Sequence, residues 1–354
     1  MLFIVEFYAP HVGGVELLFE LLARDLVKAG HSVTVLTSRV NGTPYREVRD
    51  GVHVQRVWVP KMGSRYAFTV LALIQAWRLA GQADIIHTTT FNAALPAALV
   101  GRLRRKPVIV TVHEVWGDLW KRIPGIPPLT AGVFQAFEWF IMQLPYTKYV
   151  CVSQATEKSL NHYYPRSQGK SVVVYNGLDL DPVKSVTSKK DGIMQVLYYG
   201  RPGISKGVEN LIAAANTMNN PRVEIRMIVS SDEPKRYDFL KRQITSSQVH
   251  MEPSLPRKGL MEAIAAADYV VIPSLCEGFG FAALEACLLG KKVLCSNQGA
   301  LPEVVSGQIA FFNPWKTEEL TALLNQLPEV RFTTTPLRIF PLSDTCNNYL
   351  ALYQ

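Results

Sequence analysis

The sequence lacks the cysteine pattern of a disulfide scaffold or of a zinc module. It contains five cysteines in 354 residues, an odd number with no C-x-x-C spacing. Three of them lie in apolar runs, which is typical of proteins in a reducing compartment. We therefore expect neither a disulfide framework nor a zinc site.

Long hydrophobic runs and low-complexity tracts are also missing. A transmembrane helix needs about 18–20 uninterrupted apolar residues, and the nearest candidate, residues 129–145, is broken by Gln135, Glu138 and Gln143. The first residues lack the features of a signal peptide and read as a strand. With 48% hydrophobic and 19% charged residues, we expect a globular cytoplasmic protein.

Acidic residues are fewer than basic ones, 29 against 37, which gives a formal net charge of +8. A positive charge favours phosphate-bearing partners, namely nucleotides, nucleic acids or anionic lipids. The densest basic run, Arg102–Lys106, has no interleaved aromatic residues and precedes an expected strand. It reads as a solvated helix end, so we expect no nucleic-acid partner.

What the sequence does contain is an alternation of short apolar runs with amphipathic stretches, which indicates parallel βαβ units. The first half predicts strands within residues 2–8, 31–38, 52–59, 83–89, 107–113, 148–153 and 171–176. The second half predicts them within residues 194–200, 223–230, 268–274, 291–297 and 308–313. Because one core rarely grows beyond about 250–300 residues, the pattern predicts an α/β protein with two doubly wound, Rossmann-like domains.

The expected domain limits follow from a polar stretch in the middle of the chain. We expect a first domain over residues 1–180, a linker over 181–192 and a second domain over 193–330. A closing helix over 343–354, with Ser343 or Asp344 as its N-cap, would return to the first domain. Open α/β sheets bind ligands at the carboxyl ends of their strands, so we expect a shared site in a cleft between the two domains.

Two glycine-bounded turns follow the first strand of each half. Gly13 and Gly14 stand at a strand-to-helix turn, which suits either a phosphate at a helix N-terminus or a tight structural turn. Residues 200–207 place Arg201 and Lys206 on one loop. A planar guanidinium and a mobile ammonium suit a pyrophosphate, and a solvated basic loop is the alternative.

Residues 276–287, CEGFGFAALEAC, bracket a glycine-rich turn with two carboxylates, Glu277 and Glu285. Their spacing lets both point toward the strand ends. A carboxylate among alanine and leucine needs a partner, which a sugar or ribose hydroxyl or a neighbouring strand would supply. Residues 278–283 also fit the dinucleotide pattern G-x-G-x-x-G/A, which ranks second because no acid ends the next strand.

Seven stretches together resemble one family: residues 10–16, 110–118, 152–160, 175–179, 200–207, 273–286 and 299–305. In order and spacing they are similar to the retaining GT-B glycosyltransferases of family 4, also called glycosyl transferases group 1, which include bacterial mannosyltransferases and sucrose synthase. The resemblance spans nearly the whole chain. It implies a hexosyltransferase that moves a sugar from a UDP- or GDP-linked donor to a glycan or lipid-linked acceptor, with retention of configuration.

The resemblance also implies site residues. Gly13 and Gly14 would lie against the donor sugar and phosphate, and Glu277 would hydrogen-bond the transferred sugar. The donor diphosphate would be held by Arg201 and Lys206. The resemblance further implies that His113 is an active-site histidine and that Glu285 binds the ribose hydroxyls. The backbone amides of Phe279, Gly280 and Phe281 would bind the sugar and phosphate.

Several alternatives stay open at this stage. A sugar-nucleotide epimerase or hydrolase, or a non-catalytic nucleotide-sugar-binding subunit, would use the same architecture. Asp179 and Asp181 form an Asp-x-Asp pair that reads as a turn more readily than as a metal site, so we expect metal-independent activity. His87 either lines the site or is structural.

The aromatic-rich stretch over residues 114–140 follows His113 and carries Lys121 and Arg122. It is either a core helix with an irregular lead-in or a peripheral contact with the anionic cytoplasmic face of a membrane.

Overall fold

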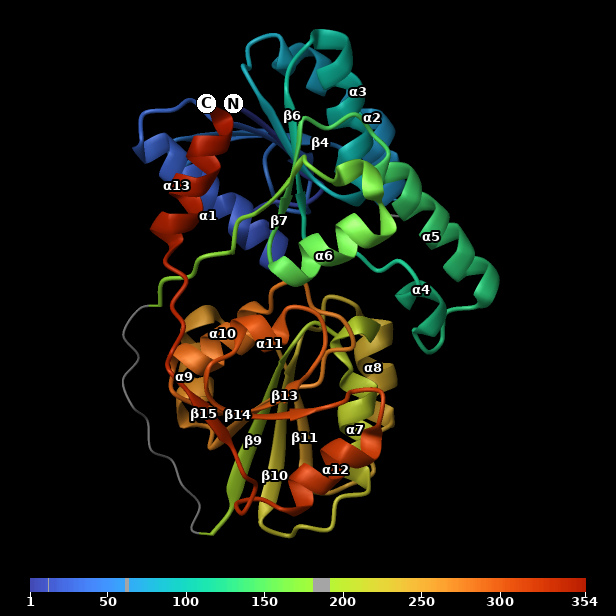
Figure 1. Ribbon diagram of the computed structural model, residues 1–354, viewed down its shortest axis with the longest axis vertical. Coiled ribbons are helices and arrows are strands. Elements are labelled where there is room, and N and C mark those ends of the chain that lie inside the picture. The colour runs from blue at the N-terminus through green and yellow to red at the C-terminus, as the bar shows by residue number, and fades with distance from the viewer. Residues whose placement is uncertain (12, 61–63, 181–191) are drawn as a thin grey trace. The chain divides into compact units, whose positions relative to one another are not determined.

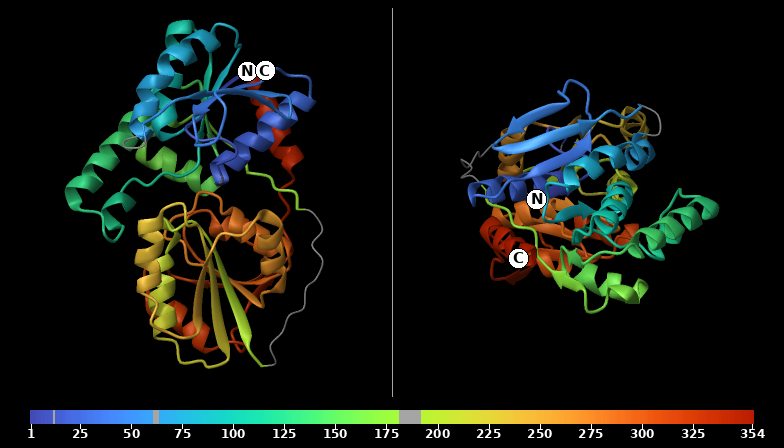
Figure 2. Two further views of the ribbon diagram at one scale, coloured as in Figure 1. Left: turned by 180° about the vertical axis from the view of Figure 1, so that it is seen from behind. Right: turned by 90° about the horizontal axis from the view of Figure 1, so that it is seen from above.

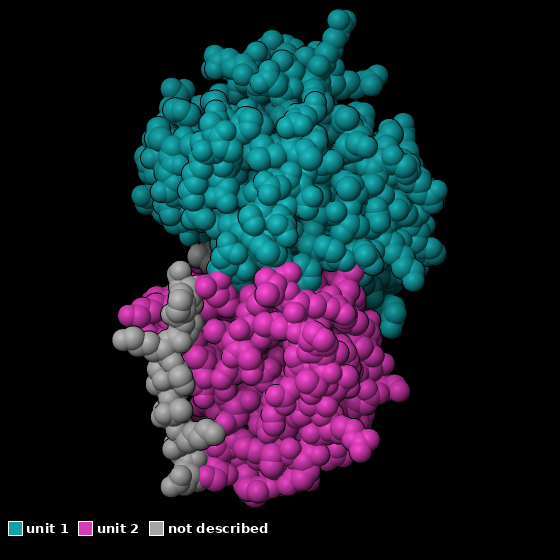
Figure 3. All heavy atoms as spheres, turned by 60° about the vertical axis from the view of Figure 1, so that its left-hand side comes forward, with its two compact units in different colours: residues 1–179, 340–354 teal, residues 180–339 magenta. Residues whose placement is uncertain are grey.

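The computed structural model describes residues 1–354 except for residues 12, 61–63 and 181–191. The chain divides into two compact units, unit 1 with residues 1–179 and 340–354 and unit 2 with residues 180–339 (Figure 3). All but the last residue of the expected linker, 181–192, lie outside the described residues.

Unit 1 is built on an eight-stranded sheet in the order β3-β4-β2-β1-β5-β6-β7-β8 (Figure 1). Every neighbouring pair is parallel except β3 with β4. The strands are β1 (Leu2–Ile4), β2 (Thr34–Ser38), β3 (Arg46–Arg49), β4 (Val52–Val57), β5 (Ile86–Thr89), β6 (Val108–Val112), β7 (Lys148–Cys151) and β8 (Ser171–Val173). The helices are α1 (Gly14–Lys28), α2 (Ser64–Ala80), α3 (Ala94–Arg104), α4 (Leu119–Arg122), α5 (Pro128–Met142), α6 (Gln154–Tyr163) and α13 (Leu342–Tyr353), with short 3-10 turns η1 (Phe91–Ala93) and η2 (Pro165–Ser167).

The central strand β1 shows why the sheet is covered on both faces. Leu2 and Ile4 enter the core that α2, α3 and α5 cover, while Phe3 and Val5 enter the core under α1 and α13. Successive side chains of a strand point to opposite faces, so a strand buried on both sides is an uninterrupted apolar run. This is the run that the sequence shows.

Unit 2 repeats the arrangement on a seven-stranded sheet in the order β11-β10-β9-β12-β13-β14-β15, parallel except for β14 with β15. The strands are β9 (Met194–Gly200), β10 (Val223–Val229), β11 (Val249–Pro253), β12 (Tyr269–Ile272), β13 (Lys292–Ser296), β14 (Gly307–Phe312) and β15 (Thr333–Thr335). The helices are α7 (Val208–Asn216), α8 (Pro234–Arg242), α9 (Arg257–Ala266), α10 (Phe281–Leu288), α11 (Leu301–Val304) and α12 (Thr317–Asn325), and the turn η3 covers Ile204–Lys206. Val196 of β9 packs under α7 and α12 and Leu197 under α9 and α10. The predicted pair of doubly wound α/β domains is confirmed.

The C-terminal helix α13 packs in unit 1 against α1 (Figure 2). Its start differs from the expected one: the helix begins at Leu342, and its N-cap is Pro341, which makes no side-chain cap. The side chain of Asp179 caps the helix instead, because its Oδ1 accepts a hydrogen bond from Leu342 N at 3.3 Å. The first aspartate of the Asp-x-Asp pair therefore caps a helix, and the second, Asp181, lies outside the described residues.

Candidate functional site

Two loops of unit 2 meet at the carboxyl ends of β9 and β12. Leu275 N donates to Ser205 O at 2.7 Å, which ties the loop after β12 to η3. Gly207 ends η3 with φ +65°, and a Cβ there would lie 2.0 Å from the Pro273 carbonyl oxygen. Only glycine allows this approach, so the glycine after Lys206 fixes how closely the two loops pack.

That packing brings Lys206 and Glu277 together. Lys206 Nζ donates to Glu277 Oε1 at 3.0 Å and to Oε2 at 2.9 Å. Ser274 Oγ donates to the same Oε2 at 3.0 Å. The side chains are 21% and 13% exposed, so a partly buried cation and carboxylate neutralise each other at the strand ends. These are the two residues that the resemblance assigns to the diphosphate and to the sugar.

The second cation of the loop, Arg201, is exposed. Its guanidinium has no ion-pair or hydrogen-bond partner among the described residues. Its loop is held by Arg236 of α8, which donates from Nε to Pro202 O at 3.0 Å and pairs with Glu209 at the start of α7. No sequence pattern pointed to Arg236, because a charged residue on a polar helix carries no signal of its own.

The helix α10 begins directly after the glycine-rich turn. Gly280 has φ +97° and Phe281 is the first helical residue, so the amides of the first turn of α10 lack intrahelical carbonyl partners. Phe279 is buried, and its ring meets that of Phe281 edge to face at 5.4 Å. A helix N-terminus at this position suits an anion.

Gly299 supports the turn from behind. It has φ +57°, and a Cβ there would lie 2.2 Å from Glu277 O. Ala300 N donates to the same carbonyl at 2.9 Å. This glycine positions the backbone of Glu277, a role that the sequence alone did not assign.

Glu285 is 4% exposed in α10 and pairs with Arg257, the first residue of α9. Tyr199 contacts the carboxylate and donates from its hydroxyl to Ala282 O at 2.5 Å. Burial raises the pKa of Glu285, and the Arg257 charge and the hydrogen bonds oppose that rise. The expected need for a partner is met by Arg257, which the sequence did not single out because it follows an unremarkable Leu-Pro turn.

In unit 1, Gly13 and Gly14 form the start of α1. Gly13 is the N-cap, and a Cβ there would lie 2.2 Å from Glu16 Oε2. Glu16 is 7% exposed, and its Oε1 lies 3.1 Å from His11 Nδ1. The turn is therefore lined by a buried carboxylate that the sequence analysis did not weigh.

His113 follows β6, and its side chain is half-buried. Its Nε2 is itself buried and has no hydrogen-bond partner among the described residues. Burial lowers the pKa of His113 to about 4, against a smaller opposing effect of the Glu16 charge. A neutral imidazole whose Nε2 has no partner can form a hydrogen bond with a bound ligand.

His87 is structural. It is fully buried, its Nε2 lies 2.8 Å from Thr111 Oγ1, and its Nδ1 lies 2.6 Å from Tyr353 Oη. Both ring nitrogens are therefore used inside unit 1, where they tie α13 to the sheet. Of the two readings of His87, the structural one holds.

The loop after His113 is held by Glu138, which the sequence analysis had treated only as an interruption of an apolar run. Its carboxylate accepts hydrogen bonds from Trp116 N at 2.8 Å, Gly117 N at 2.9 Å and Trp120 Nε1 at 3.0 Å. The rings of Trp116 and Trp120 stack at 4.4 Å. These tryptophans build the loop and are not free anchors.

Comparison with known proteins supports a single family. Residues 12–182 match the model described as Glycosyltransferase Family 4, and residues 182–331 match Glycosyl transferases group 1. The chain is 25% identical to the MMP alpha-(1->4)-mannosyltransferase of Mycolicibacterium hassiacum, covering 90% of this chain and 86% of that protein. It is also 25% identical to the glycogen synthase of Mycobacterium tuberculosis, covering 85% of this chain and 79% of that protein.

Solved structures agree on the fold. Sucrose-phosphate synthase from Thermosynechococcus elongatus superposes with a TM-score of 0.81 at 18% identity, over 99% of this chain and 98% of that one. Anabaena HepE, solved in complex with UDP and glucose, superposes with a TM-score of 0.75 at 18% identity, over 99% of both chains. The family matches favour the sugar-nucleotide reading of residues 278–283 over the dinucleotide one. The chain belongs to the family 4, or group 1, glycosyltransferases and has the GT-B fold.

Proposed function

We propose that this glycosyltransferase moves a hexose from a UDP- or GDP-linked donor to a glycan or lipid-linked acceptor, with retention of anomeric configuration, at the cytoplasmic face of a membrane. The observation that carries the donor part is the Lys206–Glu277 pair beside the exposed Arg201. The mannosyltransferase relative and the UDP complex of HepE support a nucleotide-sugar donor.

The chemistry required is stabilisation of a leaving nucleoside diphosphate, whose bridging oxygen gains negative charge as the glycosidic bond breaks. Fixed cations and backbone amides in a water-poor site stabilise that charge. Lys206 would turn from Glu277 to the diphosphate, and Arg201 would join it. Glu277, released from its ion pair, would then accept hydrogen bonds from the sugar hydroxyls.

The remaining donor contacts would come from α10. The backbone amides of Phe279, Gly280 and Phe281 would meet the sugar and phosphate. Glu285 would accept the two ribose hydroxyls, with Arg257 keeping its carboxylate ionised in a buried position. A carboxylate held in this way is a ready acceptor for a vicinal diol.

In unit 1, Gly13 and Gly14 would allow the donor phosphate and sugar to approach the start of α1. His113 would offer its unpaired Nε2 to the transferred sugar or the acceptor. Because its pKa is lowered to about 4, the imidazole is neutral at neutral pH and acts as a hydrogen-bond partner and not as a cation. Both roles rest on the family resemblance.

A thermal-shift screen against UDP-, GDP- and ADP-sugars, with NAD and NADP as controls, tests the donor site. A ligand at about 100 times its dissociation constant adds about 2.7 kcal/mol and raises the midpoint. We expect one nucleotide sugar to shift the wild type, and Arg201→Ala with Lys206→Ala to remove the shift. A shift with NAD alone would contradict the proposal.

Product analysis with that donor separates transfer from the alternatives. Transfer requires an acceptor, whereas a hydrolase releases free sugar and an epimerase changes the sugar nucleotide without one. A non-catalytic subunit would bind the donor and turn over none of it with any acceptor offered. The anomeric configuration of the product, read by NMR, tests retention.

A further inference from the structure

The outward side of α2 is apolar. Tyr66, Val70, Ile74 and Trp77 follow one another at helical spacing and are 65%, 65%, 67% and 41% exposed. The opposite side, with Phe68, Ala72 and Ala76, is fully buried. A surface helix of a globular protein normally turns polar residues to solvent, so α2 has an apolar face that no described part of the chain covers.

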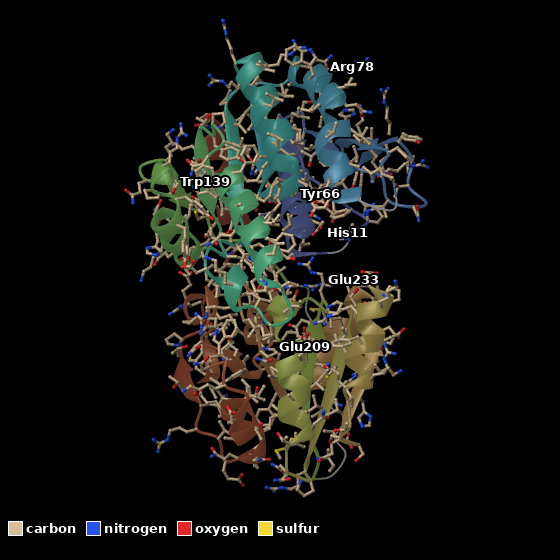
Figure 4. All side chains as sticks on the ribbon, turned by 90° about the vertical axis from the view of Figure 1, so that its right-hand side faces the viewer. His11, Tyr66, Arg78, Trp139, Glu209 and Glu233 are labelled. Atoms are coloured by element: carbon tan, nitrogen blue, oxygen red, sulfur yellow. The ribbon has the colours of Figure 1, made fainter. Side chains whose placement is uncertain are left out.

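The same pattern occurs on α5. Leu129, Val133 and Phe140 share one side of that helix and are 83%, 58% and 43% exposed, next to Trp139 at 56%. Both α2 and α5 contact the turn η1, and both face the viewer in Figure 4, where Tyr66 and Trp139 are labelled. We name the outward sides of α2 and α5, with α3 beside α2, the α2–α5 face.

The charged side chains of α2 and α3 have one sign. The sequences of α2 and α3 contain no Asp or Glu, and the one carboxylate of α5, Glu138, is fully buried. Arg78 and Arg102 are exposed at the ends of α2 and α3, and the Arg104 guanidinium lies 3.8 Å from the centre of the Trp77 ring. An exposed carboxylate does lie near α5, where Asp118 accepts a hydrogen bond from Gln135 at 3.2 Å. Exposed apolar and aromatic side chains next to the arginines of α2 and α3 complement an anionic surface that has an apolar interior.

We infer that the α2–α5 face docks on the surface of an anionic lipid bilayer, with Ile74 and Val133 entering the boundary between headgroups and acyl chains. Amphipathic helices bind such interfaces through buried apolar area together with the attraction of Lys and Arg to anionic lipid. Among the described helices none has the length and hydropathy needed to cross a membrane.

This inference changes which residues make the contact. The sequence pointed to the stretch over residues 114–140, whose Trp116 and Trp120 are tied to Glu138 inside unit 1. The exposed apolar side chains lie on the outer side of α5, within that stretch, and on α2, outside it. The inference rests on the membrane location proposed above. It is independent of the donor site, because it uses none of the residues proposed to bind the nucleotide sugar.

Flotation of the full chain with phosphatidylcholine vesicles, with and without phosphatidylglycerol, tests the inference without any turnover. We expect binding that requires phosphatidylglycerol and weakens with salt. Ile74→Glu and Val133→Glu should each lower it at least roughly tenfold, and Arg78→Ala about fivefold. Ile339→Glu is the matched control, since Ile339 of unit 2 is 66% exposed against 67% for Ile74.

Three results would overturn the inference. The wild-type protein could fail to float with either type of vesicle at low salt. Ile339→Glu could lower binding as much as Ile74→Glu does. Sedimentation could show a dimer that Ile74→Glu dissociates while vesicles bind neither form, which would make the face an interface between copies of this chain. Unchanged circular dichroism and thermal midpoint keep Ile74→Glu interpretable, because the side chain it replaces is exposed.

Discussion

Lys206 and Glu277 stand 71 positions apart in the chain, yet the ammonium donates to both carboxylate oxygens at 3.0 and 2.9 Å. Each group is proposed to bind a different part of the donor, so donor binding must exchange one charge pair for two new contacts. The pair keeps both side chains oriented and neutralised in the absence of a ligand. It also means that a change to either residue alters the environment of the other.

Lys206→Ala should lower kcat by about 10²–10³, because it removes a preorganised cation from the charge that develops on the leaving diphosphate. Lys206→Arg should retain part of the activity. Initial rates with the donor found in the thermal-shift screen measure the effect. Lys258→Ala, an exposed lysine at the start of α9, should leave the rate unchanged. Equal rates for Lys206→Ala and wild type would remove the leaving-group role.

Gly207→Ala should disrupt the same site through the backbone. Gly290 supplies the matched control, because its φ of +68° is close to the +65° of Gly207 but nothing lies within 4 Å of the position of its Cβ. Both substitutions carry the left-handed backbone penalty of about 1–2 kcal/mol. Only in Gly207→Ala would the new Cβ also clash with Pro273 O. This variant should therefore have the lower free energy of unfolding in urea, and it should also bind the donor more weakly. Similar losses in the two variants would show that the close packing of the loops has no role.

The sequence predicts a strand well where the strand is buried, because burial requires a pattern of apolar residues, and poorly where the strand is exposed. All twelve expected strands are present, and all but β8, whose three residues are half-buried, contain buried apolar residues. The missed strands are β3, β11 and β15. Strands β3 and β15 are almost wholly exposed, β11 has one buried residue, and all three lie at sheet edges. Their pairing comes from backbone hydrogen bonds that any exposed sequence can make.

The candidate site divides in the same way. Glycine spacing and the two glutamates mark where the loops lie, since a positive φ and a close approach restrict the residue type. The residues that pair with these carboxylates and support these loops cannot be recognised in the sequence. Arg257 and Arg236 are charged side chains on helices with exposed faces, and only the fold shows that they meet Glu285 and Glu209.

Turnover should resist EDTA. Lys206 and Arg201 are proposed to supply the positive charge that a metal ion would bring to a diphosphate, and Asp179 is engaged at the start of α13. The residues that the structure describes hold no group of three or more His, Cys, Asp or Glu side chains placed to bind a metal ion. Rates measured before and after chelation test this. Activity that EDTA abolishes and Mg²⁺ or Mn²⁺ restores would contradict it.

His87 should make the protein less stable in acid. Its burial, with a smaller effect of His113, lowers its pKa from 6.5 to about 3. Below pH 6.5 the unfolded chain takes up a proton that the folded chain refuses, so the free energy of unfolding falls by about 1.4 kcal/mol per pH unit down to the folded pKa. When urea unfolding is measured across this pH range, the unfolding free energy of His87→Leu should fall with decreasing pH less steeply than that of the wild type, by about 1.4 kcal/mol per pH unit. The exposed His250→Leu is the control, and an unchanged slope in His87→Leu would contradict the assignment.

Arg257→Ala should destabilise unit 2 in a pH-dependent manner. It leaves the Glu285 carboxylate buried without its cation, a loss of about 1–3 kcal/mol that stays moderate because the Arg257 side chain is 50% exposed and solvent screens the pair. Burial already holds the pKa of Glu285 above 4.5, and removing Arg257 raises it further.

A carboxyl group with a raised folded pKa costs stability once the pH is above that pKa. As the pH falls through it, the folded state takes up a proton that the unfolded state does not yet bind, and the cost is relieved. The difference in unfolding free energy between wild type and Arg257→Ala should therefore be large at neutral pH and shrink in acid. In the Glu285→Gln background no charge remains to be compensated, so Arg257→Ala should cost little there at any pH. If the cost of Arg257→Ala is the same in both backgrounds, the ion pair does not hold Glu285, and the carboxylate that we propose binds the ribose would have to be kept ionised in some other way.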